Sequence, residues 1–131
     1  MQPLAESTTD AELIALIDEW VALLEREDYA AAIALTEQDP DQQNWTADGL
    51  REVIKSYGAA TKRQRVTLTG VPSDVEQRKE VDRWKANARG EIGEIWYDLN
   101  IDGVVSDLTA IFRIVRVRGG VVVRLDDVHV M

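Results

Sequence analysis

The sequence has 131 residues and 45% hydrophobic content, which suits one globular domain with a single core. Its 24 acidic side chains outnumber 15 lysines and arginines, and the net charge of −9 disfavours nucleic acid and anionic membranes as partners. Cysteine is absent, which excludes disulfides and thiolate chemistry.

Targeting and membrane signals are also missing from the sequence. No apolar run approaches the roughly 20 residues of a membrane-spanning helix. The first residues lack the basic and apolar regions of a signal peptide. We therefore expect a soluble, cytoplasmic protein that makes no membrane contact.

The N-terminal part predicts helices. A polar lead over residues 1–9 contains several N-cap candidates, and an apolar stripe typical of a helix follows it. Asp28 is expected to cap a second, shorter helix, and Thr46 a third that runs to about Tyr57, with Gly58 as its stop. The stripe of the first helix consists of Leu13, Ile14, Leu16, Ile17, Trp20, Val21 and Leu24.

The C-terminal part predicts strands, because β-branched and aromatic residues dominate from position 93 onward. Asp102-Gly103 and Gly119-Gly120 are read as two-residue hairpin loops, so Ile101 faces Val104 and Arg118 faces Val121. A short strand is also expected near residue 66. Residues 73–89 are highly charged, and only a weak strand pattern around Trp84 is visible there.

This register divides the strands into two faces. The first face carries Gly93, Ile95, Tyr97, Leu99, Ile101, Leu108, Ala110, Phe112, Ile114, Val121, Val123, Leu125, Asp127 and His129. The register pairs Tyr97 with Leu108, Ile95 with Ala110, Ile114 with Leu125, and Arg113 with Asp126. It also opposes Asp98 and Asp107, a repulsion that a bulge near either residue would remove.

The second face predicts a homodimer. It presents a large apolar area formed by Trp96, Ile111, Val115, Val117, Val122, Val128 and Val130. The helices are too few to cover both sides of the sheet, and exposed patches of this size are uncommon on monomers. The alternative is that residues 73–89 fold over this face.

Helices followed by a long-stranded antiparallel sheet predict an α+β fold. We expect one domain over residues 1–131, with a helical part at 10–58 and a sheet part at 65–131. The segments EWVALLEREDYAAAIAL and TADGLREVIKSYG, with the C-terminal hairpins, resemble the NTF2-like (cystatin-like) superfamily, in particular uncharacterised bacterial members. The resemblance implies a curved sheet wrapped on the helices, often an internal pocket and often a dimer. The superfamily includes ketosteroid isomerases, dehydratases and many proteins without known activity.

Residues Asp98, Asn100 and Asp102 match the first half of a calcium-binding loop. The twelfth position, where such a loop needs a bidentate glutamate, is Thr109, and the flanks read as strands. Asp-Gly is also what a hairpin turn requires conformationally. The sequence therefore predicts no tight calcium site, and no cofactor is expected.

Asp127 and His129 are the candidate acid–base groups. Residues at i and i+2 of a strand point the same way, so the carboxylate and the imidazole could orient one another. On the first face they would line an apolar pocket together with Trp20, Tyr97, Leu108 and Phe112. The alternatives are a hydrogen-bonded structural histidine, or a bulge at Asp126-Asp127 that sends His129 to the other face.

Three functions are compatible with this pattern. The first is a non-catalytic binding protein for a small molecule or a protein partner. The second is an isomerase or dehydratase that uses Asp127 and His129. The third is an accessory or immunity-type protein whose acidic surface binds a basic partner. An open pocket would favour the first two, and a filled interior would favour the third.

Overall fold

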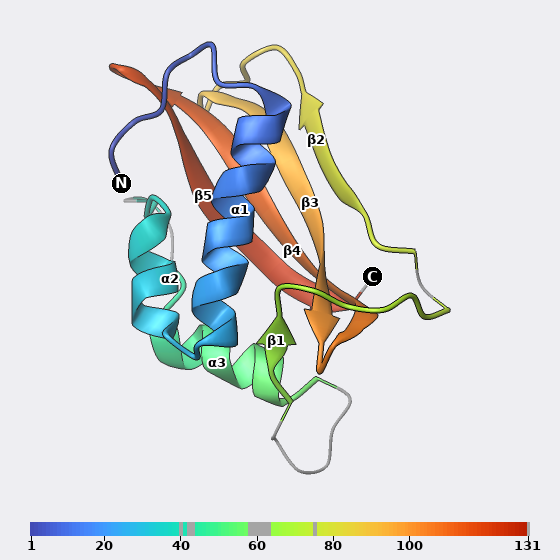
Figure 1. Cartoon of the computed structure of the whole chain (residues 1–131). Coiled ribbons are helices and arrows are strands. Elements are labelled where there is room, and N and C mark those ends of the chain that lie inside the picture. Colours follow the sequence, from blue (N-terminus) through green and yellow to red (C-terminus); the bar gives the residue numbers. More distant parts are fainter. Residues whose placement is uncertain (40, 42–43, 58–63, 75, 131) are drawn as a thin grey trace.

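The computed structural model describes residues 1–39, 41, 44–57, 64–74 and 76–130. Three helices precede a curved, unclosed, five-stranded antiparallel sheet in the strand order β1-β3-β4-β5, with β2 also paired to β3 (Figure 1). The elements are α1 (Asp10–Glu25), α2 (Tyr29–Leu35), α3 (Ala47–Lys55), β1 (Val66–Thr67), β2 (Lys79–Arg83), β3 (Glu91–Ile101), β4 (Val104–Val117) and β5 (Gly120–Val130). The predicted α+β fold is confirmed.

Polar caps explain where the helices begin. Thr9 caps α1, Asp28 accepts a hydrogen bond from the third residue of α2, and Thr46 does the same for α3. The two caps predicted for the shorter helices are therefore confirmed. The third helix ends at Lys55, slightly earlier than expected, and its predicted stop at Gly58 lies outside the described residues.

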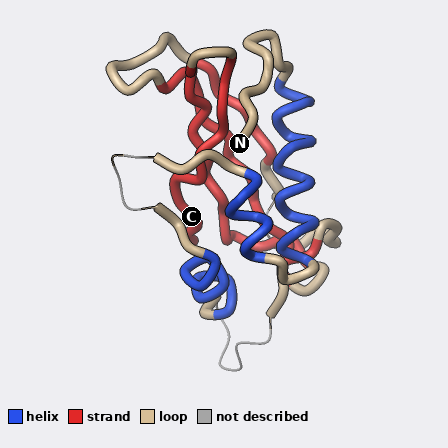
Figure 2. The backbone as a smooth tube through the Cα atoms, turned by 90° about the vertical axis from the view of Figure 1, so that its left-hand side faces the viewer, coloured by secondary structure: helices blue, strands red, loops and turns tan. Residues whose placement is uncertain are grey.

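α1 and α2 lie on one side of the sheet, and the side view separates α1 from the strands, whereas α3 lies at the end of the sheet near the C-terminus (Figures 1 and 2). We call the helix-covered side of the sheet the inner face and the other side the outer face. Trp20 from α1 meets Phe112 from β4 edge to face, with ring centroids 5.0 Å apart and planes at 87°. Both side chains have 0% exposure, and Tyr97 and Leu108 have 1% and 2%. The structure thus places these four predicted pocket residues in a packed core.

The first hairpin has the predicted loop, because Ile101 pairs with Val104 around Asp102-Gly103. A bulge then shifts the register by two residues, so Asp98 pairs with Thr109 instead of Asp107. The predicted pairing of Tyr97 with Leu108 is wrong for the same reason. The bulge removes the opposed carboxylates, and a two-residue shift keeps every side chain on its expected face.

The neighbouring pair in that hairpin changes accordingly: Ile95 pairs with Phe112, not with Ala110. The second predicted loop is wrong by one position. Val117 pairs with Gly120, so the turn residues are Arg118 and Gly119. Gly119 has a φ of 93°, a left-handed value that a glycine adopts at little cost.

The pairing of β4 with β5 differs from the predicted one along its whole length. Ile114 pairs with Val123 instead of Leu125, and Arg113 pairs with Arg124 instead of Asp126. Arg113 nevertheless reaches Asp126 diagonally, with Nη2 3.5 Å from Oδ2. The predicted attraction survives although the predicted register does not.

A second bulge decides the orientation of the end of β5. Phe112 pairs with Leu125, whereas Ile111 pairs with Asp127, so Asp126 is an additional residue in β5. One inserted residue reverses the alternation of all later side chains. Val128 is therefore in the core with 3% exposure, and the expectation that Asp127 and His129 share the inner face with Phe112 is wrong.

The outer face lacks the exposed apolar area on which the dimer prediction was based. Ile111, Val115 and Val122 are only 7%, 2% and 2% exposed in the single chain. The alternative, in which residues 73–89 fold over this face, is not what the structure shows, because β2 pairs with β3 as an edge strand of the same sheet. Side chains from that segment reach the outer face: the Arg78 guanidinium is 4.6 Å from the Trp96 ring centroid, and Arg113 is 5.9 Å from that of Trp84. The homodimer remains a prediction.

A buried cation ties the helices together where α1, α2 and α3 meet. Lys55 has a side-chain exposure of 5%; its Nζ donates to the Gln64 carbonyl at 2.8 Å and lies 3.4 Å from Glu27 Oε2. Arg65 donates to the other oxygen of the same carboxylate, with Nη2 2.6 Å from Glu27 Oε1. The hydrogen bond from Arg65, together with Lys55, lowers the pKa of Glu27 below its usual value.

Replacing Phe112 with Ala should lower the free energy of unfolding by about 3–5 kcal/mol, because it opens a cavity against Trp20. Urea unfolding followed by tryptophan fluorescence measures this change. Val104→Ala is the matched control, since Val104 is 41% exposed and should change stability little. A Phe112→Ala protein as stable as the control would contradict the packed-core assignment.

Replacing Glu27 with Gln should destabilise the fold by on the order of 1 kcal/mol at neutral pH, because Lys55 loses its counter-charge. Because the pKa of Glu27 is lower in the folded protein than in the unfolded chain, its ionised carboxylate stabilises the fold at pH values above the unfolded pKa of 4.5. This stabilisation is lost as the pH falls from 4.5 through the folded pKa. The stability difference from wild type should therefore shrink below pH 4.5. Glu19→Gln, at an exposed position of α1, should show no such pH-dependent difference.

Candidate functional site

The suspected calcium ligands hold the chain itself. Asp98 is 5% exposed; its Oδ1 accepts from the Thr109 hydroxyl at 2.6 Å, and its Oδ2 from the Arg78 backbone N–H at 2.8 Å. Asn100 donates to the Leu68 carbonyl at 3.1 Å. Asp102 accepts from the Arg65 backbone N–H at 3.0 Å. Asp98 Oδ2, the Asn100 amide N–H and Asp102 thus fix backbone segments that lie beside β3, and Asp98 Oδ1 binds a side chain of β4, which are structural roles.

Asp127 and His129 do contact each other, as predicted. His129 Nδ1 lies 2.7 Å from Asp127 Oδ2, an ion-pair distance when the imidazole is protonated. Both side chains are about half exposed, at 42% and 48%. The pair lies outside the packed core, and His129 lines a groove at the surface.

This groove, which we call the terminal groove, lies between α3, the first part of β4 and the C-terminal end of β5. Its volume is about 690 Å³, and apolar atoms form most of its surface. It is lined by Val53, Ser56, Tyr57, Asp107, Leu108, His129 and Val130. It contains two of the predicted ligand-binding residues, Leu108 and His129, but it is not the predicted interior cavity.

A hydrogen-bonded pair forms one wall of the terminal groove. The Tyr57 hydroxyl donates to Asp107 Oδ1. Burial of the phenol and the neighbouring carboxylate raise the pKa of Tyr57 above its usual value. A second depression of about 340 Å³ shares both residues and continues toward Val104 and Ser73. The Tyr57–Asp107 pair therefore separates two adjacent apolar depressions.

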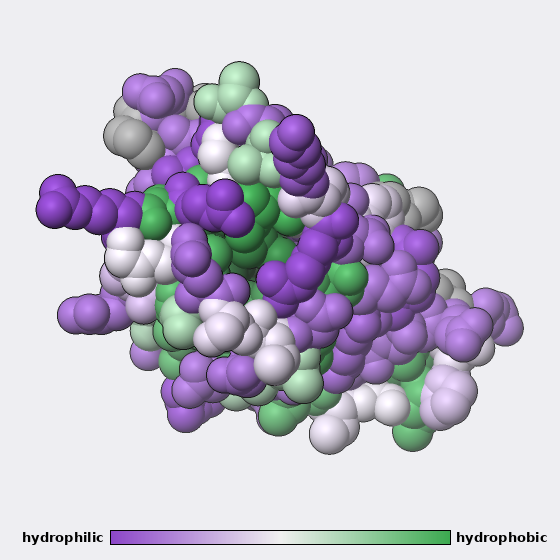
Figure 3. Space-filling view, turned by 90° about the horizontal axis from the view of Figure 1, so that it is seen from above, coloured by the Kyte–Doolittle hydropathy of each residue, from purple (hydrophilic) through white to green (hydrophobic). Residues whose placement is uncertain are grey.

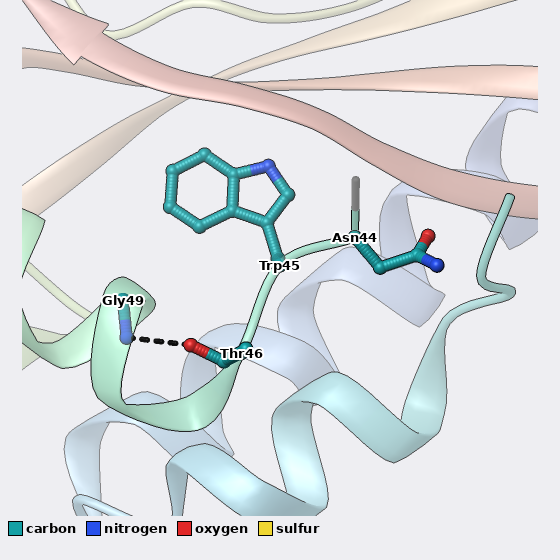
Figure 4. Close-up of a pocket in the computed structure, with 4 residues that line it drawn as sticks. All are labelled: Asn44, Trp45, Thr46 and Gly49. Atoms are coloured by element: carbon teal, nitrogen blue, oxygen red, sulfur yellow. Dashed lines mark hydrogen bonds between the residues drawn. The ribbon is translucent and has the colours of Figure 1, made fainter. Parts of the chain in front are cut away.

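Two other surface depressions offer less chemistry. The first is a depression at the start of α3, lined by Asn44, Trp45, Thr46 and Gly49 (Figure 4). There Thr46 accepts from the Gly49 N–H at 3.0 Å, an ordinary helix cap, and the Trp45 indole donates to the Asp126 carbonyl at 3.2 Å. The polar groups of this depression are therefore used by the fold itself.

Seen from the opposite end of the molecule, apolar residues form the floor of a hollow that hydrophilic side chains surround (Figure 3). A groove near the start of α1 is lined by Leu4, Thr8, Glu12, Ala15, Leu16 and Glu19. The groove has two carboxylates, those of Glu12 and Glu19, and Glu12 is already engaged because it completes the N-cap of α1. The terminal groove combines a phenol, a carboxylate and an imidazole, and it is the better candidate.

Sequence reasoning missed Tyr57 and Asp107 as site residues. Tyr57 was identified only as the approximate end of a predicted helix, and Asp107 only as part of an unfavourable strand pair. The two residues are 50 positions apart, and no short motif joins them. Only the packing of α3 against the end of the sheet brings them together.

Two further observations concern the described residues. Within this part of the chain, histidine and acidic side chains form no group of three or more that could hold a metal ion. The helices described here are all too short or too polar to cross a membrane.

The three tyrosines, Tyr29, Tyr57 and Tyr97, should resist ionisation in the folded protein. Burial is the largest cause that raises the pKa of each phenol above 10.0. Because the folded protein holds these phenols neutral, their ionisation does not affect stability at pH values below the unfolded pKa and destabilises the fold at pH values above it. Phenolate absorbance should therefore appear together with unfolding. Ultraviolet absorbance and circular dichroism recorded during one alkaline titration test this. A phenolate signal near pH 10 in a still-folded protein would contradict it.

Comparison with known proteins identifies a family but no characterised relative. No curated protein and no solved structure matches the chain. A family model described as "Domain of unknown function (DUF7668)" matches residues 21–131, which include the last five residues of α1, the other two helices and the entire sheet. The chain therefore belongs to this family of domains of unknown function.

Proposed function

We propose that the protein is a non-catalytic binding protein whose terminal groove takes an apolar ligand. The observation that carries this proposal is the composition of the groove, in which Val53, Leu108 and Val130 surround a few polar groups. Its volume of about 690 Å³ falls in the range of ligand sites. Val130 is 54% exposed, so a ligand could bury apolar surface there that water now contacts.

The polar groups of the groove support selectivity. Asp107 accepts from Tyr57 and is a carboxylate that can accept further hydrogen bonds from a ligand. Serine and histidine side chains, Ser56 and His129, add donors and acceptors at the rim. A ligand with an apolar body and one hydrogen-bond donor or positive charge fits this arrangement.

This proposal moves the predicted site from the interior to the surface. Helices packed on one face of a curved sheet support a relationship to the NTF2-like superfamily, which we retain as a proposal together with a cytoplasmic location. The interior that the resemblance implied as a pocket is occupied here by Trp20 and Phe112. Ligand binding at the end of the sheet requires no internal cavity.

A proton-transfer enzyme is the second candidate function. Asp127 Oδ2 lies 2.7 Å from His129 Nδ1, outside hydrogen-bond geometry, and the nearby negative charge can stabilise the protonated imidazole of a histidine that acts as a general base. Because His129 lines the groove, a bound carbonyl compound could lie within its reach. Solvent deuterium incorporation into such a compound, abolished by His129→Gln, would favour the enzyme over the binding protein.

The binding proposal predicts that the neutral, apolar dye Nile red becomes fluorescent in the terminal groove. Val130→Glu should weaken dye binding about tenfold, which corresponds to about 1.4 kcal/mol, because it places a charge at the apolar wall. Fluorescence titration measures the dissociation constant.

Val71→Glu is the matched control for the dye experiment. Val71 is 61% exposed and lies outside the groove lining, so the same added charge should leave dye binding unchanged. An equal loss in both variants, or no saturable binding to the wild-type protein, would contradict the proposal.

A further inference from the structure

The edge of β5 that faces away from β4 is covered by other segments of the same chain along most of its length. Leu4 forms two backbone hydrogen bonds with Val121, of 2.7 and 2.9 Å, and Glu37 donates its N–H to the Val123 carbonyl at 2.8 Å. Trp45 then donates its indole N–H to the Asp126 carbonyl. Extended segments of this chain thus already bind this edge by main-chain hydrogen bonds, as added strands do.

The last part of the edge is covered differently. Val128 pairs with Ala110 and Val130 with Leu108, and by alternation the backbone N–H groups of Val128 and Val130 point away from β4. The Val128 N–H donates to the carboxylate of its own neighbour Asp127 at 2.8 Å. Here the half-exposed side chain of Asp127 alone covers the edge, whereas other segments of the chain cover the earlier part of β5.

The terminal groove lies directly beside this open edge. α3 lies near the C-terminal end of β5 (Figure 2), and the groove lining includes Val53 from α3 and His129 and Val130 from β5. Because Val130 borders both the groove and the open edge, a chain added at this edge can place a side chain in the groove. A second copy of the chain carries the same net charge of −9, which disfavours edge-to-edge pairing of two copies.

We call the terminal groove together with the open end of the β5 edge the slot. The groove lining contains the acidic Asp107 and no lysine or arginine, and at the edge Asp127 accepts from the Val128 N–H and pairs with His129. The whole chain has a net charge of −9. A segment that carries lysine or arginine beside an apolar residue complements this slot in both charge and shape.

We propose that the slot between α3 and the end of β5 takes an extended, basic segment of a partner protein, which adds to β5 as a short strand. The inference rests on the proposed function, since an apolar side chain of the segment occupies the terminal groove. Backbone groups of the segment pair with the outward-facing groups of Val128 and Val130, and its basic side chain reaches Asp107 or Asp127. In the free protein the Asp127 carboxylate accepts the hydrogen bond of the Val128 N–H, and a backbone carbonyl of the bound segment replaces it.

The probe is the synthetic peptide acetyl-Arg-Val-Lys-Val-Arg-amide, tested against the full chain by calorimetry and by amide hydrogen exchange. We expect the peptide to displace Nile red and to slow exchange at Val128 and Val130 at least tenfold. Two N-methylated versions give the decisive comparison: one methylated on both valine amides, the other on the lysine and the last arginine amides. In an added strand, alternate amides face β5, so one version should bind at least tenfold more weakly and the other should bind like the parent.

Val130→Pro and Val130→Thr form a matched pair of variants. Proline removes the outward N–H of an exposed residue at an edge, where proline is tolerated, while threonine keeps that N–H. Both variants lack the valine side chain of the groove wall, so the comparison isolates the N–H, and the peptide should bind the proline variant at least tenfold more weakly than the threonine variant. A peptide in which glutamate replaces lysine and arginine should not bind, and equal binding would overturn the assignment of a basic partner.

The outcomes separate the two proposals. If Nile red binds but the peptide does not, or if both methylated versions bind like the parent, strand addition is overturned and the binding groove stands. If neither dye nor peptide binds, both proposals are overturned. Dimerisation of the chain at micromolar concentration that is lost in Val130→Pro would assign the edge to a second copy and overturn the proposed partner.

Discussion

The contact between Trp20 and Phe112 connects the helical layer to the sheet. Trp20 lies in the middle of α1, Phe112 lies in the middle of β4, and both are fully buried. α2 contributes mainly small alanines and α3 is short, so α1 supplies most of the large side chains that cover the inner face. Because protein interiors are densely packed, these aromatic rings use the volume that a ligand would need inside the sheet. The space for the proposed binding is therefore at the ends and edges of the sheet.

One additional residue in β5 determines the chemistry at one of those ends. Without the bulge at Asp126, Asp127 and His129 would lie in the core, and two polar groups would be desolvated there. With it, Val128 completes the core, while the carboxylate and imidazole remain half exposed. The same bulge brings the Asp126 carbonyl to the Trp45 indole and leaves the Val128 N–H to Asp127. Packing, edge protection and the candidate site thus share one backbone irregularity.

Many acidic side chains serve as ties between distant segments. Asp18 accepts from the buried Tyr97 hydroxyl, which joins α1 to β3, and Glu27 joins Arg65 to Lys55. Asp98 and Asp102 hold the segments that precede β2 and β1. Such carboxylates are used by the fold, so the net charge overstates the free acidic surface. The carboxylates beside the terminal groove differ, because Asp107 and Asp127 border open space that a partner can enter.

The sequence by itself determined the α+β class, the order of the elements, the helix caps and the first hairpin loop. These features follow from local physics: apolar periodicity, capping side chains and the Asp-Gly turn act over a few residues. Asp127 and His129 also contact each other as their i, i+2 spacing indicated, because that geometry needs no knowledge of the face on which they lie. The apolar outer face was read correctly only in part, because Val128, assigned to it from alternation, lies in the core.

Only the tertiary structure decided the registers, the faces and the site. A bulge costs little locally and is chosen by the packing of the whole sheet, so neither the insertion at Asp126 nor the shift beside Asp98 could be read from alternation alone. One such insertion reversed the orientation of Asp127 and His129. Tyr57 and Asp107 meet because α3 packs on the end of the sheet, a contact between residues 50 positions apart. Local patterns determine elements, whereas long-range packing determines which side chains share a surface.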